Sequence, residues 1–280
     1  MKVGIVGGHG FIGSALSSEL AGHEVVPFTR DYPLTSPEAA DVVADLDALV
    51  WAASSSTPAT LAKHPEYADV ELAEFTETLG VLADLPEKRL IVLSSGGTVY
   101  GNSPSPHDES APLAPVSVYG ELKVRIEERL KELQPHATIL RLSNVYGPGQ
   151  LGVGGQGVLA HWMNAIAEGG SPVIYGDPEV ARDYIYIGDA VRGIRLALET
   201  DVRGQIINLG SGYPTTLREL YAEVAAVTGI DNRPDIQPGR PYDNQSTWLQ
   251  ISRARELLDW EPTVTLGDGI RNMWEWKERK

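Results

Sequence analysis

A tyrosine and a lysine four residues apart, Tyr119 and Lys123, are the side chains of this sequence best suited to do chemistry. Residues at i and i+4 of a helix lie on the same face, so the ammonium group can lie beside the phenol and favour its ionised form. Such a pair can act as an acid or a base in a proton transfer. Because this spacing also occurs by chance on solvated helices, other motifs must support the interpretation.

A glycine-rich loop lies between the first predicted strand and the first predicted helix. Its glycines are Gly7, Gly10 and Gly13, and Phe11 and Ile12 begin the helix. A Gly-x-x-Gly-x-x-Gly loop in this context lets the backbone approach a pyrophosphate, whose charge is met by the helix N-terminus. We therefore predict that these five residues bind a dinucleotide.

The end of the second predicted strand bears on the choice of cofactor. A carboxylate usually accepts the adenosine ribose hydroxyls there, but this sequence has Thr29 and Arg30. An arginine suits a 2′-phosphate, so these residues favour NADP over NAD. Asp31 follows directly, and a register shifted by one residue would favour NAD instead.

Short β-branched runs alternate with helical patterns along the first half of the chain. We predict strands over residues 2–6, 23–28, 48–52, 89–93 and 138–142, and helices over residues 11–20, about 65–85 and 117–133. This alternation predicts an α/β fold, a Rossmann-type doubly wound parallel sheet covered on both faces. In the third helix the predicted buried stripe consists of Leu122, Ile126, Leu130 and Leu133.

Beyond residue 145, connections rich in glycine and proline join shorter elements. We predict a helix over residues 156–168, strands over 172–175, 183–187 and 205–209, and helices over 188–199, 216–228 and 267–277. Thr216 and Glu219 have the spacing of a capping box at the start of one of these helices. This half should form a smaller carboxy-terminal lobe folded onto the first.

Composition and charge limit the classes of partner. The formal net charge of −15 disfavours nucleic acid and an anionic membrane surface, which both need a basic footprint. The chain has no cysteine, and its six histidines show no metal-ligand spacing, so no metal site is predicted. Without a recognisable signal peptide or membrane-spanning run, we expect a cytoplasmic protein.

Taken together, the motifs resemble those of the extended short-chain dehydrogenases/reductases of the nucleotide-sugar epimerase/dehydratase group. The resemblance covers essentially the whole chain. It rests on the glycine loop, on Tyr119 and Lys123, and on the segments at residues 51–53, 93–101, 108–120, 141–147, 181–189, 208–212 and 251–260.

The resemblance implies a dinucleotide-binding lobe, residues 1–145 plus about 188–210, and a nucleotide-sugar-binding lobe, about 146–187 and 211–280. Hydride would pass between the nicotinamide and the sugar, usually at C4. Tyr119 would be the acid/base, and Lys123 would bind the nicotinamide ribose. By the same analogy the cofactor contacts Ala52, Ala53 and Ser94, whereas the nucleotide sugar contacts Ser95, Asn144, Arg182 and Arg240.

Four departures from the family pattern limit the chemistry and the shape of the pocket. Gly96 stands where many relatives have a catalytic serine or threonine, so the hydroxyl must come from Ser95 or Thr98, and we favour Ser95. A dehydratase is disfavoured because its acidic pair is missing, and the lack of cysteine disfavours epimerases that use one. Residues 30–47 leave little room for a further strand, which implies a trimmed adenosine side of the pocket.

Two enzyme activities remain open from the sequence. A 4-ketoreductase would reduce a keto sugar nucleotide with exchangeable NADPH, and Arg30 favours this interpretation. A 4-epimerase, similar to a UDP-glucose 4-epimerase, would keep NAD bound and return the hydride to the same sugar. A non-catalytic dinucleotide sensor is a more distant alternative. From the family alone we also expect a possible homodimer.

Overall fold

The computed structural model describes residues 1–82, 85, 88–152, 156–200, 202–230, 232–240 and 245–279. A six-stranded sheet at its centre has the order β10-β5-β4-β3-β1-β2, with every neighbouring pair parallel. Its strands are β1 (Lys2–Val6), β2 (Glu24–Phe28), β3 (Ala48–Trp51), β4 (Arg89–Ser95), β5 (Thr138–Leu142) and β10 (Ile206–Leu209). The predicted parallel α/β sheet is confirmed.

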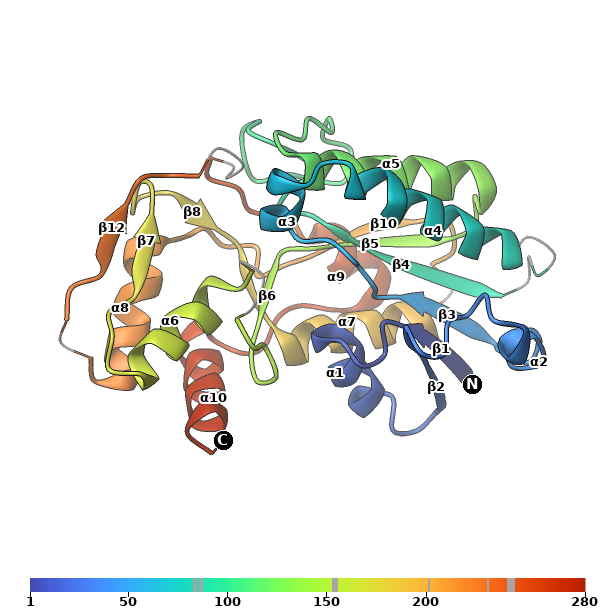
Figure 1. Cartoon of the computed structure of the whole chain (residues 1–280), viewed down its shortest axis with the longest axis horizontal. Helices are drawn as coiled ribbons and strands as arrows, with labels where there is room; N and C mark the ends of the chain where they lie inside the picture. The colour runs from blue at the N-terminus through green and yellow to red at the C-terminus, as the bar shows by residue number, and fades with distance from the viewer. Residues whose placement is uncertain are drawn as a thin grey trace.

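Helices cover both faces of this sheet (Figure 1). One face carries α3 (Pro58–Lys63), α4 (Tyr67–Val81) and α5 (Val118–Leu133), and the opposite face carries α1 (Phe11–Glu19) and α7 (Ile187–Glu199). A further helix, α9 (Ser252–Leu258), packs against α7 and β10. Because the strands are apolar on both sides, each helical layer closes its own hydrophobic core.

The sheet ends at β2 on the side expected to hold adenosine. Within the fully described stretch from Thr29 to Asp47, the chain forms only the 3-10 turn η1 (Pro37–Ala39) and the short helix α2 (Ala40–Ala44), with no strand. The expectation that this segment is too short for a further strand therefore holds. As a consequence, β2 is the edge strand.

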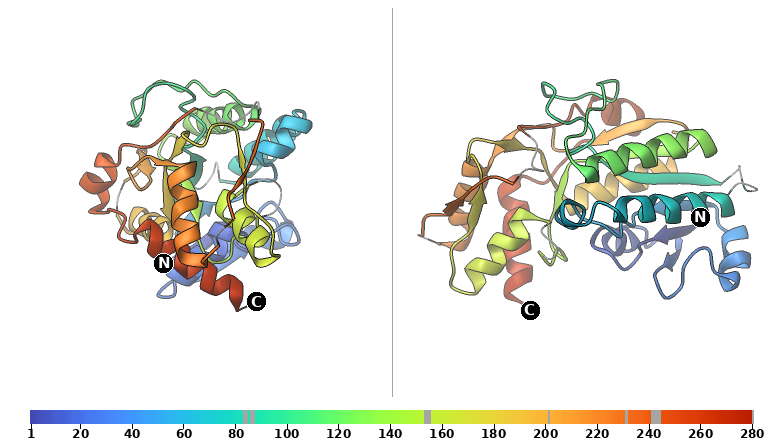
Figure 2. Two further views of the ribbon diagram at one scale, coloured as in Figure 1. Left: turned by 90° about the vertical axis from the view of Figure 1, so that its left-hand side faces the viewer. Right: turned by 45° about the horizontal axis from the view of Figure 1, so that its top comes forward.

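A smaller lobe lies beside one end of the sheet, at the left of Figure 1 and facing the viewer in the left panel of Figure 2. It contains α6 (Val158–Ala167), α8 (Leu217–Thr228), α10 (Leu266–Glu278) and two strand pairs, β7 (Val173–Tyr175) with β12 (Asp235–Gln237) and β8 (Ala181–Arg182) with β11 (Thr215–Thr216). The pair β6 (Asn144–Tyr146) and β9 (Tyr184–Tyr186) joins the lobes. Thr216 and Glu219 form the predicted capping box.

Some boundaries differ from the sequence prediction. The helix predicted over residues 65–85 spans Tyr67–Val81, preceded by the unpredicted α3. Leu133, predicted in the buried stripe of α5, is 45% exposed because it is the last residue of the helix, beyond the sheet. Residues 249–260 pack in the core of the larger lobe, although the whole of 211–280 was expected in the smaller one.

Candidate active site

The glycine loop is shaped by close backbone contacts at the carboxyl end of β1. Gly7 has a φ of 82°, and a Cβ added there would lie 3.0 Å from the backbone of Ala53. A Cβ at Gly13 would lie 2.2 Å from the carbonyl oxygen of Gly7. Gly10 is the N-cap of α1, and no side chain makes a capping hydrogen bond there. The loop therefore presents backbone N–H groups at a helix N-terminus, the arrangement that binds a phosphate group.

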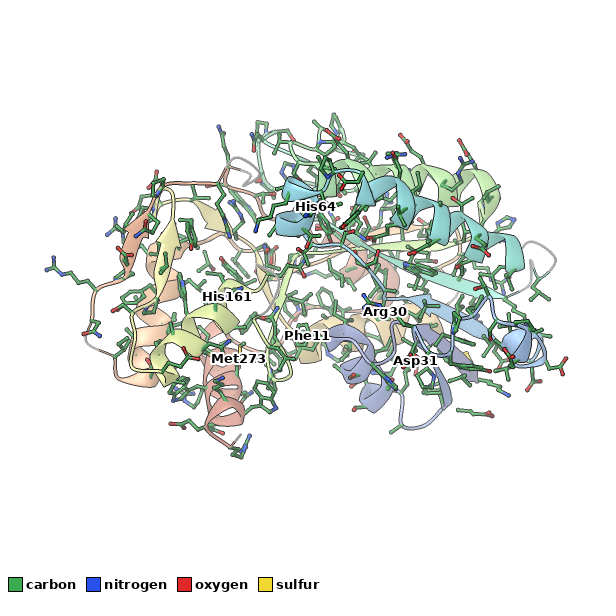
Figure 3. All side chains as sticks on the ribbon, viewed as in Figure 1. Phe11, Arg30, Asp31, His64, His161 and Met273 are labelled. Carbon is green, nitrogen blue, oxygen red and sulfur yellow. The ribbon has the colours of Figure 1, made fainter. Side chains whose placement is uncertain are left out.

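The end of β2 lies directly against this loop. The carbonyl oxygen of Phe28 accepts a hydrogen bond from Gly7 N at 3.0 Å. Thr29 and Tyr32 close a turn through two hydrogen bonds, and the ring of Tyr32 stacks on Phe28 with centroids 5.6 Å apart. Arg30 is exposed at this turn, beside Asp31 (Figure 3). This turn therefore carries an exposed positive charge and lies against the glycine loop.

The predicted pair lies on the first turns of α5. Ser117 caps this helix by accepting a hydrogen bond from Gly120 N at 3.2 Å. The ammonium nitrogen of Lys123 lies 5.3 Å from the ring centroid of Tyr119. Lys123 is only 4% exposed, whereas Tyr119 is half-buried. The structure therefore brings the ammonium group beside the phenol and leaves the phenol accessible.

The loop after β4 lies close to the start of α5. A Cβ at Gly120 would be 2.9 Å from the carbonyl oxygen of Thr98, so the helix and the loop are in direct backbone contact. Within the loop, Thr98 Oγ1 donates to the carbonyl oxygen of Ser95 at 3.4 Å, and both side chains are partly exposed. Ser95 and Thr98 therefore share an edge of the sheet with Tyr119.

Gly96 has a physical reason to be glycine. A Cβ at this position would lie 2.7 Å from a methyl carbon of Leu249, which is buried. The side chain of Leu249 thus fills the space that a side chain at position 96 would need. Leu249 comes from the carboxy-terminal part of the chain and was not predicted to be near the site.

Asn144 closes the site at the carboxyl end of β5. Its Nδ2 donates to the carbonyl oxygen of Asp183 at 2.9 Å, and a Cβ at Gly97 would lie 3.6 Å from the same nitrogen. Ser94, predicted to contact the cofactor, instead donates its hydroxyl to the buried carboxylate of Glu127 at 2.6 Å.

A buried carboxylate that the sequence analysis missed completes this part of the site. Glu71 of α4 has its Oε1 3.3 Å from the ammonium nitrogen of Lys123. The hydroxyl of Ser54, which follows β3, accepts from Lys123 at 3.2 Å and donates to Glu71 at 2.8 Å. Glu71 lies on the same face of α4 as Phe75 and Leu79, at positions i, i+4 and i+8. A charged residue within this apolar stripe is the sequence signal that could have identified Glu71 as buried.

The two predicted arginines lie in the smaller lobe. Arg182 of β8 donates to the carbonyl oxygens of Ala181 and Gln245. Arg240 lies over the ring of Tyr175, with its guanidinium carbon 4.8 Å from the centroid. Burial lowers the pKa of the His161 imidazole, and the charge of Arg240 lowers it further.

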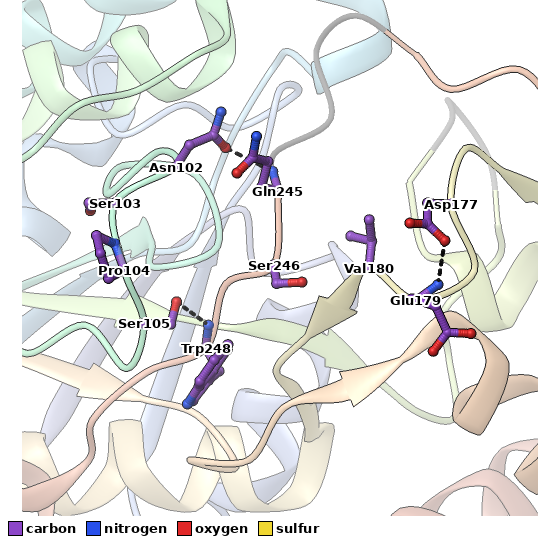
Figure 4. A pocket seen from close by; sticks show the side chains of 10 residues that line it. All are labelled: Asn102, Ser103, Pro104, Ser105, Asp177, Glu179, Val180, Gln245, Ser246 and Trp248. Atoms are coloured by element: carbon purple, nitrogen blue, oxygen red, sulfur yellow. Dashed lines mark hydrogen bonds between the residues drawn. The ribbon is translucent and has the colours of Figure 1, made fainter.

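A cavity of about 530 Å³ opens between the lobes (Figure 4). It is lined by Asn102, Ser103, Pro104, Ser105, Asp177, Glu179, Val180, Gln245, Ser246 and Trp248. None of these residues belongs to the predicted site. The two charged ones, Asp177 and Glu179, carry carboxylates, which repel an anionic ligand. We therefore place the candidate site at the carboxyl edge of the sheet.

The described residues include no group of three or more histidine, aspartate or glutamate residues that could hold a metal ion. None of the helices in this part of the chain has the length and apolar character needed to cross a membrane.

Residues 3–210 match the model of the NAD dependent epimerase/dehydratase family. The chain is 34% identical over 218 residues to a UDP-glucose 4-epimerase of Mycolicibacterium smegmatis, covering 75% of this chain and 67% of the relative. It is 38% identical over 187 residues to a dTDP-4-dehydro-6-deoxyglucose reductase of Escherichia coli, covering 65% of this chain and 59% of that protein.

Solved structures extend the similarity to the whole fold. The chain is similar to the UDP-glucose 4-epimerase of Thermotoga maritima with UDP-glucose, with a TM-score of 0.91 at 28% identity over 100% of this chain and 99% of the other. It is also similar to the Thermus thermophilus UDP-glucose 4-epimerase complex with NAD, with a TM-score of 0.88 at 26% identity over 99% of each chain.

Proposed function

The chain belongs to the NAD dependent epimerase/dehydratase family, and from this premise we propose that it transfers hydride at C4 of a nucleoside-diphosphate sugar as a 4-ketoreductase. The observation that carries the proposal is the Tyr119–Lys123 pair, held on α5 at the edge of the sheet where the glycine loop lies. Relatives with 4-epimerase and 4-keto sugar reductase activities support nicotinamide-dependent chemistry at C4. Because these relatives are enzymes, the sensor alternative loses its support.

The residues of this chain would divide the work as follows. The nicotinamide cofactor, when bound, supplies hydride to the C4 carbonyl carbon. Tyr119 donates its phenolic proton to the carbonyl oxygen, so that the ketone becomes a hydroxyl group and the phenol becomes a phenolate. Lys123 stabilises that phenolate through its positive charge. A hydroxyl group from Ser95 or Thr98, of which we favour Ser95, orients the carbonyl oxygen by hydrogen bonding.

The cofactor would occupy the glycine loop and the ends of β2 and β3. Backbone N–H groups of Phe11 to Gly13 in the first turn of α1 would bind the pyrophosphate, and the backbone of Ala52 and Ala53 would border it. A relative of this fold is solved with NAD, which supports NAD(H) binding. Our preference for NADPH rests on Arg30, exposed at the turn after β2.

The sugar nucleotide would extend from Tyr119 towards the smaller lobe. Asn144 borders the sugar end, beside Gly97. Arg182 and Arg240 are the cations we assign to the diphosphate, because an acidic protein must concentrate positive charge where an anionic ligand binds. The homodimer and the cytoplasmic location remain predictions.

A 4-epimerase is the second candidate. It is favoured by the similarity to the 4-epimerase of M. smegmatis and to the T. maritima structure with UDP-glucose. It would use the same Tyr119, first as a base at the C4 hydroxyl and then as an acid at the keto intermediate. The exposed Arg30 weighs against it, because this residue favours an exchangeable NADPH over a permanently bound NAD.

One assay separates the two candidates. Purified protein is offered a dTDP-4-keto-6-deoxy sugar with NADPH or NADH, and separately UDP-glucose or UDP-galactose with NAD. We expect net NADPH oxidation with the keto sugar and no interconversion of the two UDP-hexoses. Interconversion without net redox change would establish the epimerase instead. Tyr119→Phe is the matched control, because it removes only one hydroxyl group.

A further inference from the structure

A buried pair of opposite charges lies inside the candidate site. Lys123 and Glu71 are each 4% exposed, and their charged atoms lie 3.3 Å apart. Ser54 bridges them, and Ser55 Oγ donates to the second carboxylate oxygen of Glu71 at 3.1 Å. Lys123, Ser54 and Ser55 thus hold the Glu71 carboxylate, and Glu71 and Ser54 in turn hold the ammonium group of Lys123.

The Glu71 carboxyl is ionised at neutral pH, because its pKa lies below the ordinary value of 4.5. Burial raises the pKa of Glu71, but the charge of Lys123 and the hydrogen bonds from Ser54 and Ser56 outweigh burial and hold that pKa below its ordinary value. An ionised carboxylate this close to the ammonium group cancels most of its field at distances beyond the pair. The site therefore contains a lysine but little net positive charge around it.

This pair borders the region assigned to the cofactor. Ser54 directly follows Ala53, whose backbone lies against Gly7 of the glycine loop. On the other side, Lys123 lies against the ring of Tyr119, the residue assigned to proton transfer. A nicotinamide placed to exchange hydride beside Tyr119 must therefore lie near the pair.

The two redox forms of the cofactor differ in charge at this place. The oxidised nicotinamide ring carries a positive charge, whereas the reduced ring is neutral. An unbalanced ammonium group would repel the oxidised ring and leave the reduced ring almost unaffected. A balanced pair removes that discrimination.

We propose that Glu71 is a positioning residue that fixes Lys123 and, by balancing its charge, sets the relative affinity of the site for the oxidised and reduced cofactor. This inference rests on the proposed function, since it requires a nicotinamide dinucleotide in the glycine loop. It goes beyond that function because it assigns a role to a residue outside the Tyr119–Lys123 pair.

Dissociation constants of NADP+, NADPH, NAD+ and NADH, measured by fluorescence and calorimetric titration, test this proposal. Glu71→Gln keeps the shape of the side chain and leaves Lys123 unbalanced, so the ratio of the oxidised to the reduced dissociation constant should rise by roughly tenfold. Lys123→Gln leaves the carboxylate unbalanced, so the ratio should fall. In the double variant Glu71→Gln/Lys123→Gln the ratio should return close to the wild-type value.

Glu77→Gln is the matched control, because Glu77 is exposed on the same helix, and its ratio should equal that of the wild type. If Glu71 had a purely structural role, its substitution would weaken the binding of both redox forms alike. The change in the ratio of dissociation constants would then not have opposite signs in the two single variants. If the wild type binds a dinucleotide but the ratio of dissociation constants does not change with the charge of the pair, this inference fails while the proposed function stands. If the wild type binds none of the four dinucleotides, the proposed function falls and the inference with it.

Discussion

Arg141 of β5 forms a two-point ion pair with Glu127 of α5, with Nη2 2.7 Å from Oε2 and Nε 3.0 Å from Oε1. Both side chains are almost fully buried. Glu127 lies one turn beyond Lys123 on the same side of the helix, so this ion pair ties the helix that carries Tyr119 and Lys123 to the central sheet. Tyr100 and Ser94 complete the network through hydrogen bonds to Arg141 and Glu127.

Removing one partner of this network should destabilise the whole fold. Arg141→Met leaves the Glu127 carboxylate buried without its cation, and we expect a loss of about 3–5 kcal/mol in the free energy of unfolding. Urea denaturation followed by circular dichroism measures it. Arg129→Met, which breaks the exposed pair with Glu132, is the control and should change stability by no more than about 1 kcal/mol. Similar losses in both variants would contradict the role of burial.

Glu71 should stabilise the fold in a pH-dependent way. Burial alone would raise its pKa, but Lys123 and Ser54 hold the pKa below the ordinary value of 4.5. A carboxyl group with a lowered pKa in the folded state stabilises the protein above its unfolded pKa, and this contribution is lost as the pH falls through the folded value. The stability difference between wild type and Glu71→Gln should therefore be largest at neutral pH and shrink below pH 4.5. Urea unfolding of both proteins across this range measures the difference, and a constant difference would contradict the ion pair.

Arg30 should read the 2′-phosphate of NADPH. Its guanidinium is exposed at the turn that follows β2, next to the glycine loop. Removing a charge-assisted contact in Arg30→Ala should lower the affinity for NADPH by roughly tenfold and leave the affinity for NADH almost unchanged. Asp31→Asn is the complementary variant, and selective loss of NADH there would show that the aspartate reads the ribose hydroxyls instead. Equal losses of both cofactors in Arg30→Ala would mean that the arginine contacts no phosphate.

The contact between Gly96 and Leu249 should be sensitive to a single methyl group. A Cβ at residue 96 would be 2.7 Å from Leu249, so Gly96→Ala should lower stability by about 1–3 kcal/mol. Gly97→Ala is the control, because its Cβ would find an ordinary contact at 3.6 Å from Asn144. In combination with Leu249→Val, Gly96→Ala should cost less than it does alone. Additive losses in thermal unfolding would mean that Leu249 does not fill this space.

The sequence was sufficient for the elements whose pattern is local. Residues 138–142 form the predicted strand of the parallel sheet, and the Thr216 capping box begins its helix as predicted. Tyr119 and Lys123 meet because the i, i+4 geometry of a helix requires no tertiary information. The glycine loop is recognisable for the same reason.

Contacts between distant segments were not accessible in this way. Glu71 and Lys123 are 52 residues apart, and only the packing of α4 against α5 makes them partners. Leu249 contacts Gly96 because residues 249–260 pack in the core of the larger lobe. No hydrophobic periodicity in the sequence predicts this packing. Short elements such as α3 and α9 were missed because few residues carry their pattern.

Turnover and cofactor affinity of Tyr119→Phe, measured together, test the assignment of the acid/base most directly. The substitution removes one hydroxyl group beside Lys123, so NADPH affinity in fluorescence titration should stay within about twofold of the wild type. The rate of NADPH oxidation with the 4-keto sugar nucleotide should fall by about a thousandfold, as expected for loss of a general acid. A variant that binds NADPH normally and turns over at the wild-type rate would show that Tyr119 does not transfer the proton.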